Sequence, residues 1–340
     1  MTSVPETPKG AASLDALTRY ALAATLVALC LFFAIATEDH VFVEPGNLIN
    51  IANQSAINTI IAVGMTLVIV TGGIDLGVGS IVALAGVLCA GVMVGGLGCI
   101  VGKYRIELIP RIDGPMVAVI GLAAAGVVGV VAGLVNAASI VRFRITPFIA
   151  TLAMMLMGRG AASLYSVSPI RSLPEPFIWI GQSGRLAGVP IPVYIAAVVA
   201  GVGWVVLARS TLGRHVYAVG GNEEAARLSG IPVGRIKTLV YAGCGLCAAL
   251  AGAVLASQLG AGDCKVGQGF ELDAIAAAVL GGTSLMGGRG TIVGTVLGAL
   301  IIGVLDNGLT ILGVSSFTQM ILKGLVILGA VILDQLREKR

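Results

Sequence analysis

Residues 115–138 read PMVAVIGLAAAGVVGVVAGLVNAA, a stretch without a charged side chain. An α-helix of roughly 20 apolar residues is long enough to cross the hydrocarbon core of a bilayer, so this stretch is predicted to be a transmembrane helix. The pattern predicts an all-α, polytopic bundle of about ten transmembrane helices. Similar apolar runs recur at 20–37, 48–70, 78–98, 147–166, 190–208, 237–259, 271–285, 291–309 and 316–334.

The composition of the whole chain indicates the same class of protein. Of the 340 residues, 57% are hydrophobic and 11% are charged, and the mean hydropathy is +1.00. Soluble domains typically carry about 25% charged residues. The 49 glycines and the aromatic share of 5% favour helices that approach one another closely. The 21 basic residues are spread along the chain, so no nucleic acid partner is expected and the lipid bilayer is the expected surrounding.

The eighth run, 271–285, is poorer in apolar residues than the others. Only a few precede Gly281 and Gly282. We expect this span to be tilted, broken or re-entrant, which is tolerated only where protein or a water-filled cavity covers the backbone.

Charged residues predict the orientation of the bundle. Lys and Arg gather in the segment 209–237 and near both ends of the chain, and basic residues of short loops stay on the cytoplasmic side. The N-terminus is therefore predicted inside, and an even number of spans returns the C-terminus to the same side. Three parts are predicted: a polar cytoplasmic tail at 1–18, a transmembrane domain at 19–336 with a long inner loop at 209–237, and a cytoplasmic tail at 337–340.

Motifs of membrane hydrolases are incomplete in this chain. No HExxH occurs, so a zinc protease is not indicated. Residues 181–184 read GQSG, which is similar to the surroundings of a serine nucleophile, but the only histidines are His40 and His215, both in predicted loops. His215 is predicted on the opposite side of the membrane from Ser183, and a serine without a base is not activated. We expect no catalytic residue.

Nucleotide and metal sites are not predicted either. No GxxxxGK[ST] is present, and the glycine-rich stretch 282–290 lacks the lysine, so the chain is not expected to hydrolyse ATP. Cys244 and Cys247 form a CxxC without a second pair or a nearby histidine. They are interpreted as small apolar residues on one helix face.

The long inner loop has a readable organisation. Residues 210–237 read STLGRHVYAVGGNEEAARLSGIPVGRIK. Gly220 and Gly221 predict a turn, and Asn222 predicts the N-cap of a short helix with acidic residues in its first turn. Gly230 and Pro232 predict its end. Such a helix is too short to span the membrane, so it either docks on a soluble partner or is a surface connector.

Polar residues at membrane depth are candidates for a translocation path. Neutral amides suit an uncharged polar solute, because they form hydrogen bonds without a charge that needs a counter-ion. Amides that join two helices are an equally ordinary explanation. One group has spacings of three and four at the start of the second span, and weaker candidates follow later: Asn50, Asn53, Gln54, Asn58 and Thr59, then Asn136, Asn307 and Gln319.

Asp75 is the clearest charged candidate, because it lies between two long apolar runs. The glycines around it permit a tight break between helices. Asp75 either fixes that break at the start of the third span or faces the path, and we favour the structural role.

Two glycine patterns are also notable. Gly290, Gly294 and Gly298 form a GxxxGxxxG that predicts a close helix contact, within the bundle or with a second copy. Residues 72–76, GGIDL, are similar to residues 281–285, GGTSL, which we interpret as coincidence in so glycine-rich a chain.

Five segments together carry a resemblance to a known family. The segments are VGMTLVIVTGGIDLGVGSIVALAGV (63–87), ITPFIATLAMMLMGRG (145–160), GRHVYAVGGNEEAARLSGI (213–231), GFELDAIAAAVLGGTSLMGGRGTIVGTVLGALIIG (269–303) and DNGLTILGVSSFTQMILKGLVILGAVILD (306–334). Together the patterns extend over about 47–334 and closely resemble the ribose-type branch of the bacterial carbohydrate ABC importer permeases. The segment 97–113 departs from the family pattern by being longer and more charged.

The resemblance implies a permease subunit of the bacterial inner membrane. Such a subunit pairs with a second copy or a related permease and receives a monosaccharide, ribose or a related sugar, from an extracytoplasmic binding protein. It couples to cytoplasmic ABC ATPase subunits, which bind the ATP and Mg²⁺, and itself binds no cofactor. By position, the implied coupling helix comprises Gly221, Asn222, Glu223, Glu224, Ala225, Ala226, Arg227, Leu228, Ser229 and Gly230.

The main alternative is an ion-coupled secondary transporter of a small polar solute. That mechanism needs a buried carboxylate pair or relay, for which only Asp75 is a candidate in the sequence. The helix of the long inner loop would also lack an explanation.

Overall fold

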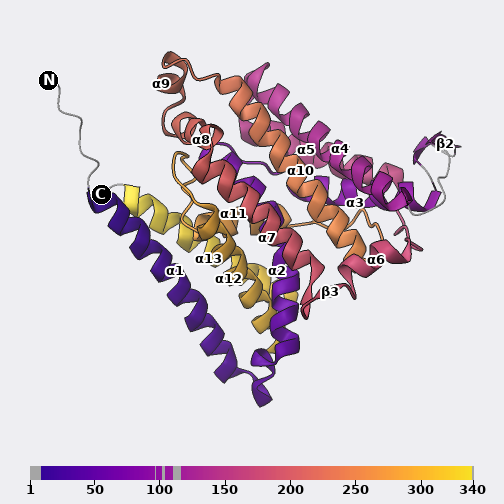
Figure 1. Cartoon of the computed structure of the whole chain (residues 1–340), viewed down its shortest axis with the longest axis horizontal. Helices are drawn as coiled ribbons and strands as arrows, with labels where there is room; N and C mark the ends of the chain where they lie inside the picture. The colour runs from indigo at the N-terminus through magenta and orange to yellow at the C-terminus, as the bar shows by residue number, and fades with distance from the viewer. Residues whose placement is uncertain (1–8, 96, 102–103, 110–115, 339–340) are drawn as a thin grey trace.

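The computed structural model describes residues 9–95, 97–101, 104–109 and 116–338. Helices make up most of this part of the chain (Figure 1). The long helices are α1 (Lys9–Ala36), α2 (Pro45–Val70), α3 (Val78–Gly95), α4 (Met116–Val141), α5 (Pro147–Tyr165), α7 (Ile191–Trp204), α10 (Val233–Leu259), α12 (Ile292–Ile311) and α13 (Ser316–Glu338). The shorter ones are η1 (Glu38–Val43), α6 (Glu175–Gly181), η2 (Val205–Arg209), α8 (Thr211–Gly221), α9 (Glu223–Leu228) and α11 (Phe270–Leu280).

Seven helices of the described residues are long and apolar enough to cross a membrane: α2, α3, α4, α5, α7 together with η2, α10 and α12. Shorter apolar stretches lie in α1, at Tyr20–Ala36, and in α13, at Ser316–Gly329. A helix lies at each predicted run, which confirms a helical polytopic membrane protein. Residues 1–8 and 339–340 of the two predicted tails lie outside the described residues.

The eighth predicted span contains only a short helix. Its 11 residues in α11 rise about 16 Å, roughly half of the hydrocarbon thickness. The helix ends at Leu280, and an irregular segment follows until α12. The short run of apolar residues before Gly281 therefore predicted the broken span.

The centre of the bundle is α10, which packs against α2, α3 and α4. Glycine permits this contact: a Cβ on Gly129 of α4 would overlap the carbonyl oxygen of Gly245 on α10, and the reverse also holds. Gly64 of α2 similarly faces Cys244 and Cys247, and its Cβ would lie 3.0 Å from each. Cys244 and Cys247 thus lie on one face of α10, as predicted, and that face makes a close contact with α2.

Two short hairpins correct the all-α prediction. Strand β1 (Leu97–Val101) pairs antiparallel with β2 (Tyr104–Ile109), and β3 (Arg185–Leu186) pairs antiparallel with β4 (Val189–Pro190). The first hairpin lies in the segment 97–113 that departs from the family pattern, of which residues 102–103 and 110–113 lie outside the described residues. The alternation of Tyr104–Ile109 favours a strand, and pairing of β1 with β2 satisfies backbone groups of this connection.

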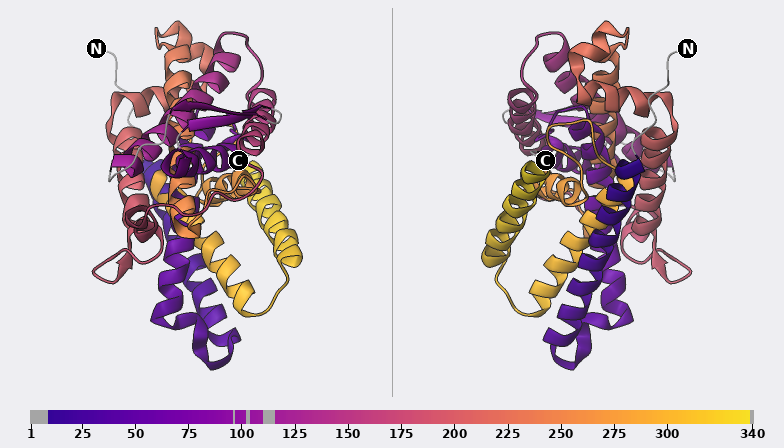
Figure 2. Two further views of the ribbon diagram at one scale, coloured as in Figure 1. Left: turned by 90° about the vertical axis from the view of Figure 1, so that its right-hand side faces the viewer. Right: turned by 90° about the vertical axis from the view of Figure 1, so that its left-hand side faces the viewer.

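The two ends of the molecule carry different elements. In Figure 1, α8, α9, the first turn of α1 and the end of α13 lie toward the upper left, whereas α6 and β3 lie toward the lower right and β2 lies at the right edge. Figure 2 shows α13, in yellow, at the edge of the bundle beyond the turn after α12. The start of α1, the end of α13 and α9 therefore share one end of the bundle.

Candidate functional site

The first helix break, residues 71–77, separates α2 from α3. Gly72 has a left-handed φ of 79°, which glycine adopts without strain. Asp75 has no exposed surface, and its Oδ1 accepts a hydrogen bond from the Gly77 N–H at 2.9 Å. Asn136 of α4 donates from Nδ2 to both carboxylate oxygens at 3.3 Å. The carboxylate thus fixes the turn that leads into α3 and joins it to α4.

The second break, residues 281–291, has the same local geometry. Gly282 has a φ of 85°, and the N–H of Thr283 bonds to the carbonyl of Ala278 as the N–H of Gly73 bonds to that of Val68. This structural match pairs Gly72 with Gly282, whereas the similarity of 72–76 to 281–285 pairs Gly72 with Gly281, so the two are one residue out of register and the interpretation as coincidence stands. The two breaks also touch, because the Gly288 N–H donates to the Val70 carbonyl at 2.9 Å.

Helix α8 is fastened to both breaks. The hydroxyl of Tyr217 donates to the carbonyl of Gly290 at 2.7 Å. A Cβ on Gly220 would overlap the Val70 carbonyl oxygen and lie 2.6 Å from the Gly288 nitrogen. The predicted turn at Gly220 and Gly221 is wrong, because both residues belong to α8. The glycine at 220 is needed for close packing rather than for a turn.

Helix α9 lies where the sequence predicts it. Asn222 is its N-cap and accepts from the Ala225 N–H at 2.9 Å. Gly230, with a φ of 82°, and Pro232 separate α9 from α10. Leu228 is 82% exposed, although it is a large apolar side chain. A short helix thus presents an apolar side chain and charges at one end of the bundle.

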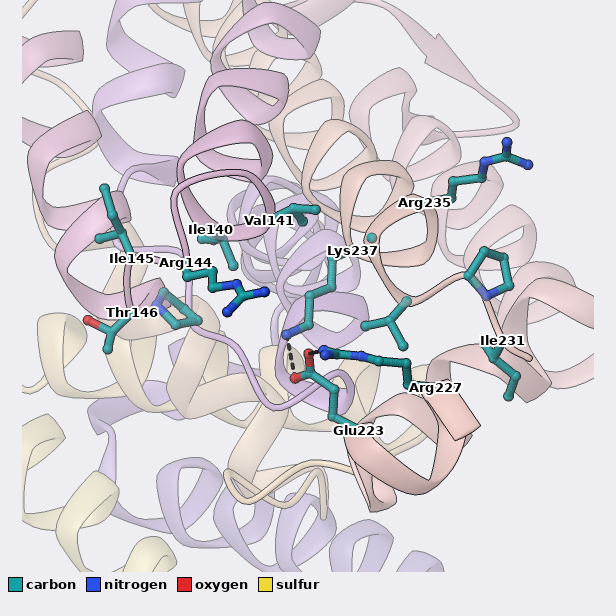
Figure 3. A pocket seen from close by; sticks show the side chains of 14 residues that line it. Ile140, Val141, Arg144, Ile145, Thr146, Glu223, Arg227, Ile231, Arg235 and Lys237 are labelled. Carbon is teal, nitrogen blue, oxygen red and sulfur yellow. Dashed lines mark hydrogen bonds and ion pairs between the residues drawn. The ribbon is translucent and has the colours of Figure 1, made fainter. Parts of the chain in front are cut away.

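A pocket of about 750 Å³ opens between α9 and the α4–α5 connection (Figure 3). Glu223 lies in it and accepts from Lys237 Nζ at 2.7 Å and from Arg227 Nη2 at 3.1 Å. Arg227 Nη1 also lies 3.8 Å from Glu224 Oε2. Partial burial alone would raise the pKa of Glu223, but the hydrogen bond and charge of Lys237, with those of Arg227, lower it below its ordinary value. Glu223 therefore ties α9 to α10.

The amide candidates do not converge on one path. Asn53 accepts from Gln258 of α10 at 3.0 Å, and Asn307 exchanges two hydrogen bonds of 2.9 Å with Asn47. Gln319 donates to the Val314 carbonyl at 2.9 Å. The remaining ones on α2 differ in exposure: Asn50 and Gln54 are exposed, Asn58 is half-buried and Thr59 is buried.

Sequence reasoning missed a charged cluster among α11, α12 and α13. Lys323 Nζ lies 3.2 Å from both oxygens of Asp273 and 2.8 Å from Asp306 Oδ2. The other oxygen of Asp306, Oδ1, is buried without a hydrogen-bond partner among the described residues. Opposite charges within the predicted spans 291–309 and 316–334 were the available signal. The sequence analysis named Asp75 as the only candidate carboxylate in the membrane domain. The structure adds Asp273 and Asp306.

The glycine stripe and the serine motif have ordinary surroundings. Gly294 and Gly298 of α12 face the carbonyls of Gly281 and Ala277, so the stripe packs within this bundle. The segment 182–184 containing Ser183 follows α6, at the opposite end of the bundle from α8, which carries His215 (Figure 1). This geometry keeps His215 away from the serine.

Known proteins resemble this chain over most of its length. The family model "Branched-chain amino acid transport system / permease component" matches residues 47–331. The ribose import permease protein RbsC of Escherichia coli (strain K12) is 47% identical over 92% of this chain and 94% of its own length. RbsC of Bacillus subtilis (strain 168) is 46% identical over 86% of each chain, and the galactose/methyl galactoside import permease protein MglC of Escherichia coli (strain K12) is 36% identical over 93% and 94%. No solved structure is significantly similar. The chain therefore belongs to this family of permease components, within its ribose-type branch, and is a multi-pass protein of the bacterial inner membrane.

Proposed function

We propose that this chain is the membrane subunit of an ATP-driven importer that moves a monosaccharide, ribose or a related sugar, into the cytoplasm. Its relatives of 36–47% identity named above are permeases for ribose and for galactose or methyl galactoside, which supports a sugar as the cargo. Two copies, or this chain and a related permease, form the pathway. A binding protein outside the membrane delivers the sugar, and partner ABC ATPases bind ATP with Mg²⁺ and hydrolyse it.

The arrangement of α8 and α9 is the observation that carries this proposal. Helix α9 exposes Leu228, and α8 touches both helix breaks through Gly220 and Tyr217. A partner that binds α9 can therefore act, through α8, on the two breaks where the transmembrane helices are interrupted. Residues 221–230 are accordingly proposed to be the coupling segment.

The proposal includes ten membrane crossings, counting the broken one at α11, with both chain ends and α9 in the cytoplasm. Accessibility of cysteines tests it. A membrane-impermeant thiol reagent should label Ser229→Cys only in inverted vesicles and Ser183→Cys only in right-side-out vesicles, because the two sites lie at opposite ends of the bundle. Labelling of both variants from one side would refute this topology.

Coupling can be tested with the partner subunits present in proteoliposomes. Glu224→Lys and Leu228→Asp should lower sugar uptake about tenfold, as expected when a central docking contact is lost, while ATP hydrolysis continues. Both side chains are exposed, so membrane insertion should be unchanged. Ser183→Ala, at the other end, should transport normally. Normal coupling in both α9 variants would refute the role of this helix.

The ion-coupled alternative has one structural feature in its favour, the two carboxylates around Lys323. The lysine compensates part of that charge, and the alternative gives α9 no role. Uptake that persists without ATP and collapses with the ion gradient would establish the alternative.

A further inference from the structure

The pocket beside α9 has an excess of positive charge. Lys237 and Arg227 are compensated by the carboxylates of Glu223 and Glu224. Arg144 and Arg235 form no ion pair with any described residue. Within the described part of the chain the pocket is thus short of two negative charges. Its lining contains one carboxylate, Glu223, and four basic side chains: Arg144, Arg227, Arg235 and Lys237.

The basic side chains come from two facing walls. In Figure 3, Arg144 extends from the α4–α5 connection toward the group formed by Glu223, Arg227 and Lys237, whereas Arg235 points away from it. An anion placed between the walls would meet cations from both sides. Guanidinium groups bind the oxygens of phosphate or carboxylate through two parallel hydrogen bonds, so this arrangement fits an oxyanion such as phosphate.

The position of the pocket along the helices favours a lipid as the source of that phosphate. On both sides of Arg144 the chain exposes large apolar rings: Phe143 is 71% exposed and Phe148 is 56% exposed. Most of α4 and α5 is unburied in this chain, with apolar residues such as Val131 and Leu156 at the surface. Exposed apolar residues that give way to arginine are typical of the boundary between hydrocarbon and headgroups.

We infer that this pocket binds the phosphate of an anionic phospholipid, with Arg144 as the principal contact and the acyl chains along α4 and α5. Basic pockets between transmembrane helices on the cytoplasmic side are suited to acidic headgroups. The inference uses the proposed function only to place the lipid in the inner leaflet. The charge of the pocket is independent of whether the chain transports a sugar.

The test measures lipid binding to the full chain in a neutral detergent, by titration with phosphatidylglycerol and with phosphatidylcholine. Phosphatidylglycerol should bind more tightly, and Arg144→Gln should weaken its binding about tenfold, as expected for loss of a charge-assisted contact. Arg142→Gln is the matched control, because Arg142 lies in the same connection but does not line the pocket. Arg144→Lys keeps the charge and should retain part of the affinity.

Further arms separate the sources of phosphate and control for folding. Inorganic phosphate that displaced phosphatidylglycerol at equal concentration would overturn a lipid ligand in favour of a soluble anion. Equal binding of phosphatidylglycerol by the wild type and by Arg144→Gln, or an equal loss in Arg142→Gln, would overturn the site. Thermal unfolding of each variant without lipid shows whether lost binding reflects lost structure. If Arg144→Gln is unfolded, the affinity of Arg144→Lys for phosphatidylglycerol tests the site instead: retained affinity supports it, and affinity equal to that for phosphatidylcholine overturns it.

Discussion

Carboxylates at membrane depth are held in two different ways in this protein. Asp75 is fully buried in the first helix break, and its hydrogen-bond partners among the described residues are neutral: a backbone N–H and the amide of Asn136. Asp273 and Asp306 instead share the ammonium group of Lys323, and all three side chains keep some exposure, between 14% and 26%. The first arrangement fixes one turn, whereas the second joins three helices.

The difference determines what each site loses when a partner is removed. If a neutral partner of Asp75 such as the Asn136 amide is removed, the carboxylate loses the hydrogen bonding of that partner only. A lysine that is lost from the cluster leaves two carboxylates facing each other without compensation, which is the costlier change. The predicted effects therefore decrease from the cluster to Asp75 and then to the ion pair of α9.

Lys323→Met should cause the largest loss. Removing one partner from a mostly buried ion cluster costs about 3 kcal/mol, because the remaining charges are left without a counter-ion. The variant should unfold at a lower temperature in detergent and release α13 from α11 and α12. The triple variant Asp273→Asn/Lys323→Met/Asp306→Asn should recover most of the stability. Wild-type stability of the single variant would show that the cluster has no such role.

Asp75→Ala should cost less, about 2 kcal/mol, because the Gly77 N–H and the Asn136 amide lose their acceptor. Asp75→Asn keeps an acceptor oxygen and the side-chain volume, so uptake near normal is expected if the role of Asp75 is structural. Uptake measured in proteoliposomes, with thermal unfolding of both variants, separates the two roles. Lost uptake in a stable Asp75→Asn protein would assign the carboxylate to the path.

Glu223→Gln should have the smallest effect on stability, at most about 0.5 kcal/mol, because Glu223 is 42% exposed and solvent screens its ion pairs. Since the pKa of Glu223 is lowered, its pairs stabilise the folded chain above the pKa of an unfolded glutamate, and this contribution is lost as the pH falls through the folded value. The difference between wild type and Glu223→Gln in thermal unfolding should therefore shrink as the pH falls below the ordinary glutamate pKa of about 4.3, and vanish once the pH lies below the lowered pKa of Glu223. A difference that persisted there would have another origin.

Local signals explain what the sequence could predict. Long apolar runs place the helices, and Asn222 with Gly230 places α9, because a cap and a stop act on neighbouring residues. The lysine cluster could not be found in the same way, since residues 273, 306 and 323 meet only through the packing of three helices. The glycine at 220 was misread for the same reason, because its close contact is with Val70, far away in the sequence.

Gly220 and its neighbour Gly221 differ sharply in their surroundings. A methyl group at 220 would collide with the Val70 carbonyl, whereas one at 221 would meet nothing within 4 Å. Position 221 is thus suited to a spectroscopic label on the proposed coupling segment, residues 221–230. The distance between a spin label at this position and a second one at the opposite end of the bundle would report any movement of α8 during turnover. The contact between Gly220 and the Val70 carbonyl would stay intact.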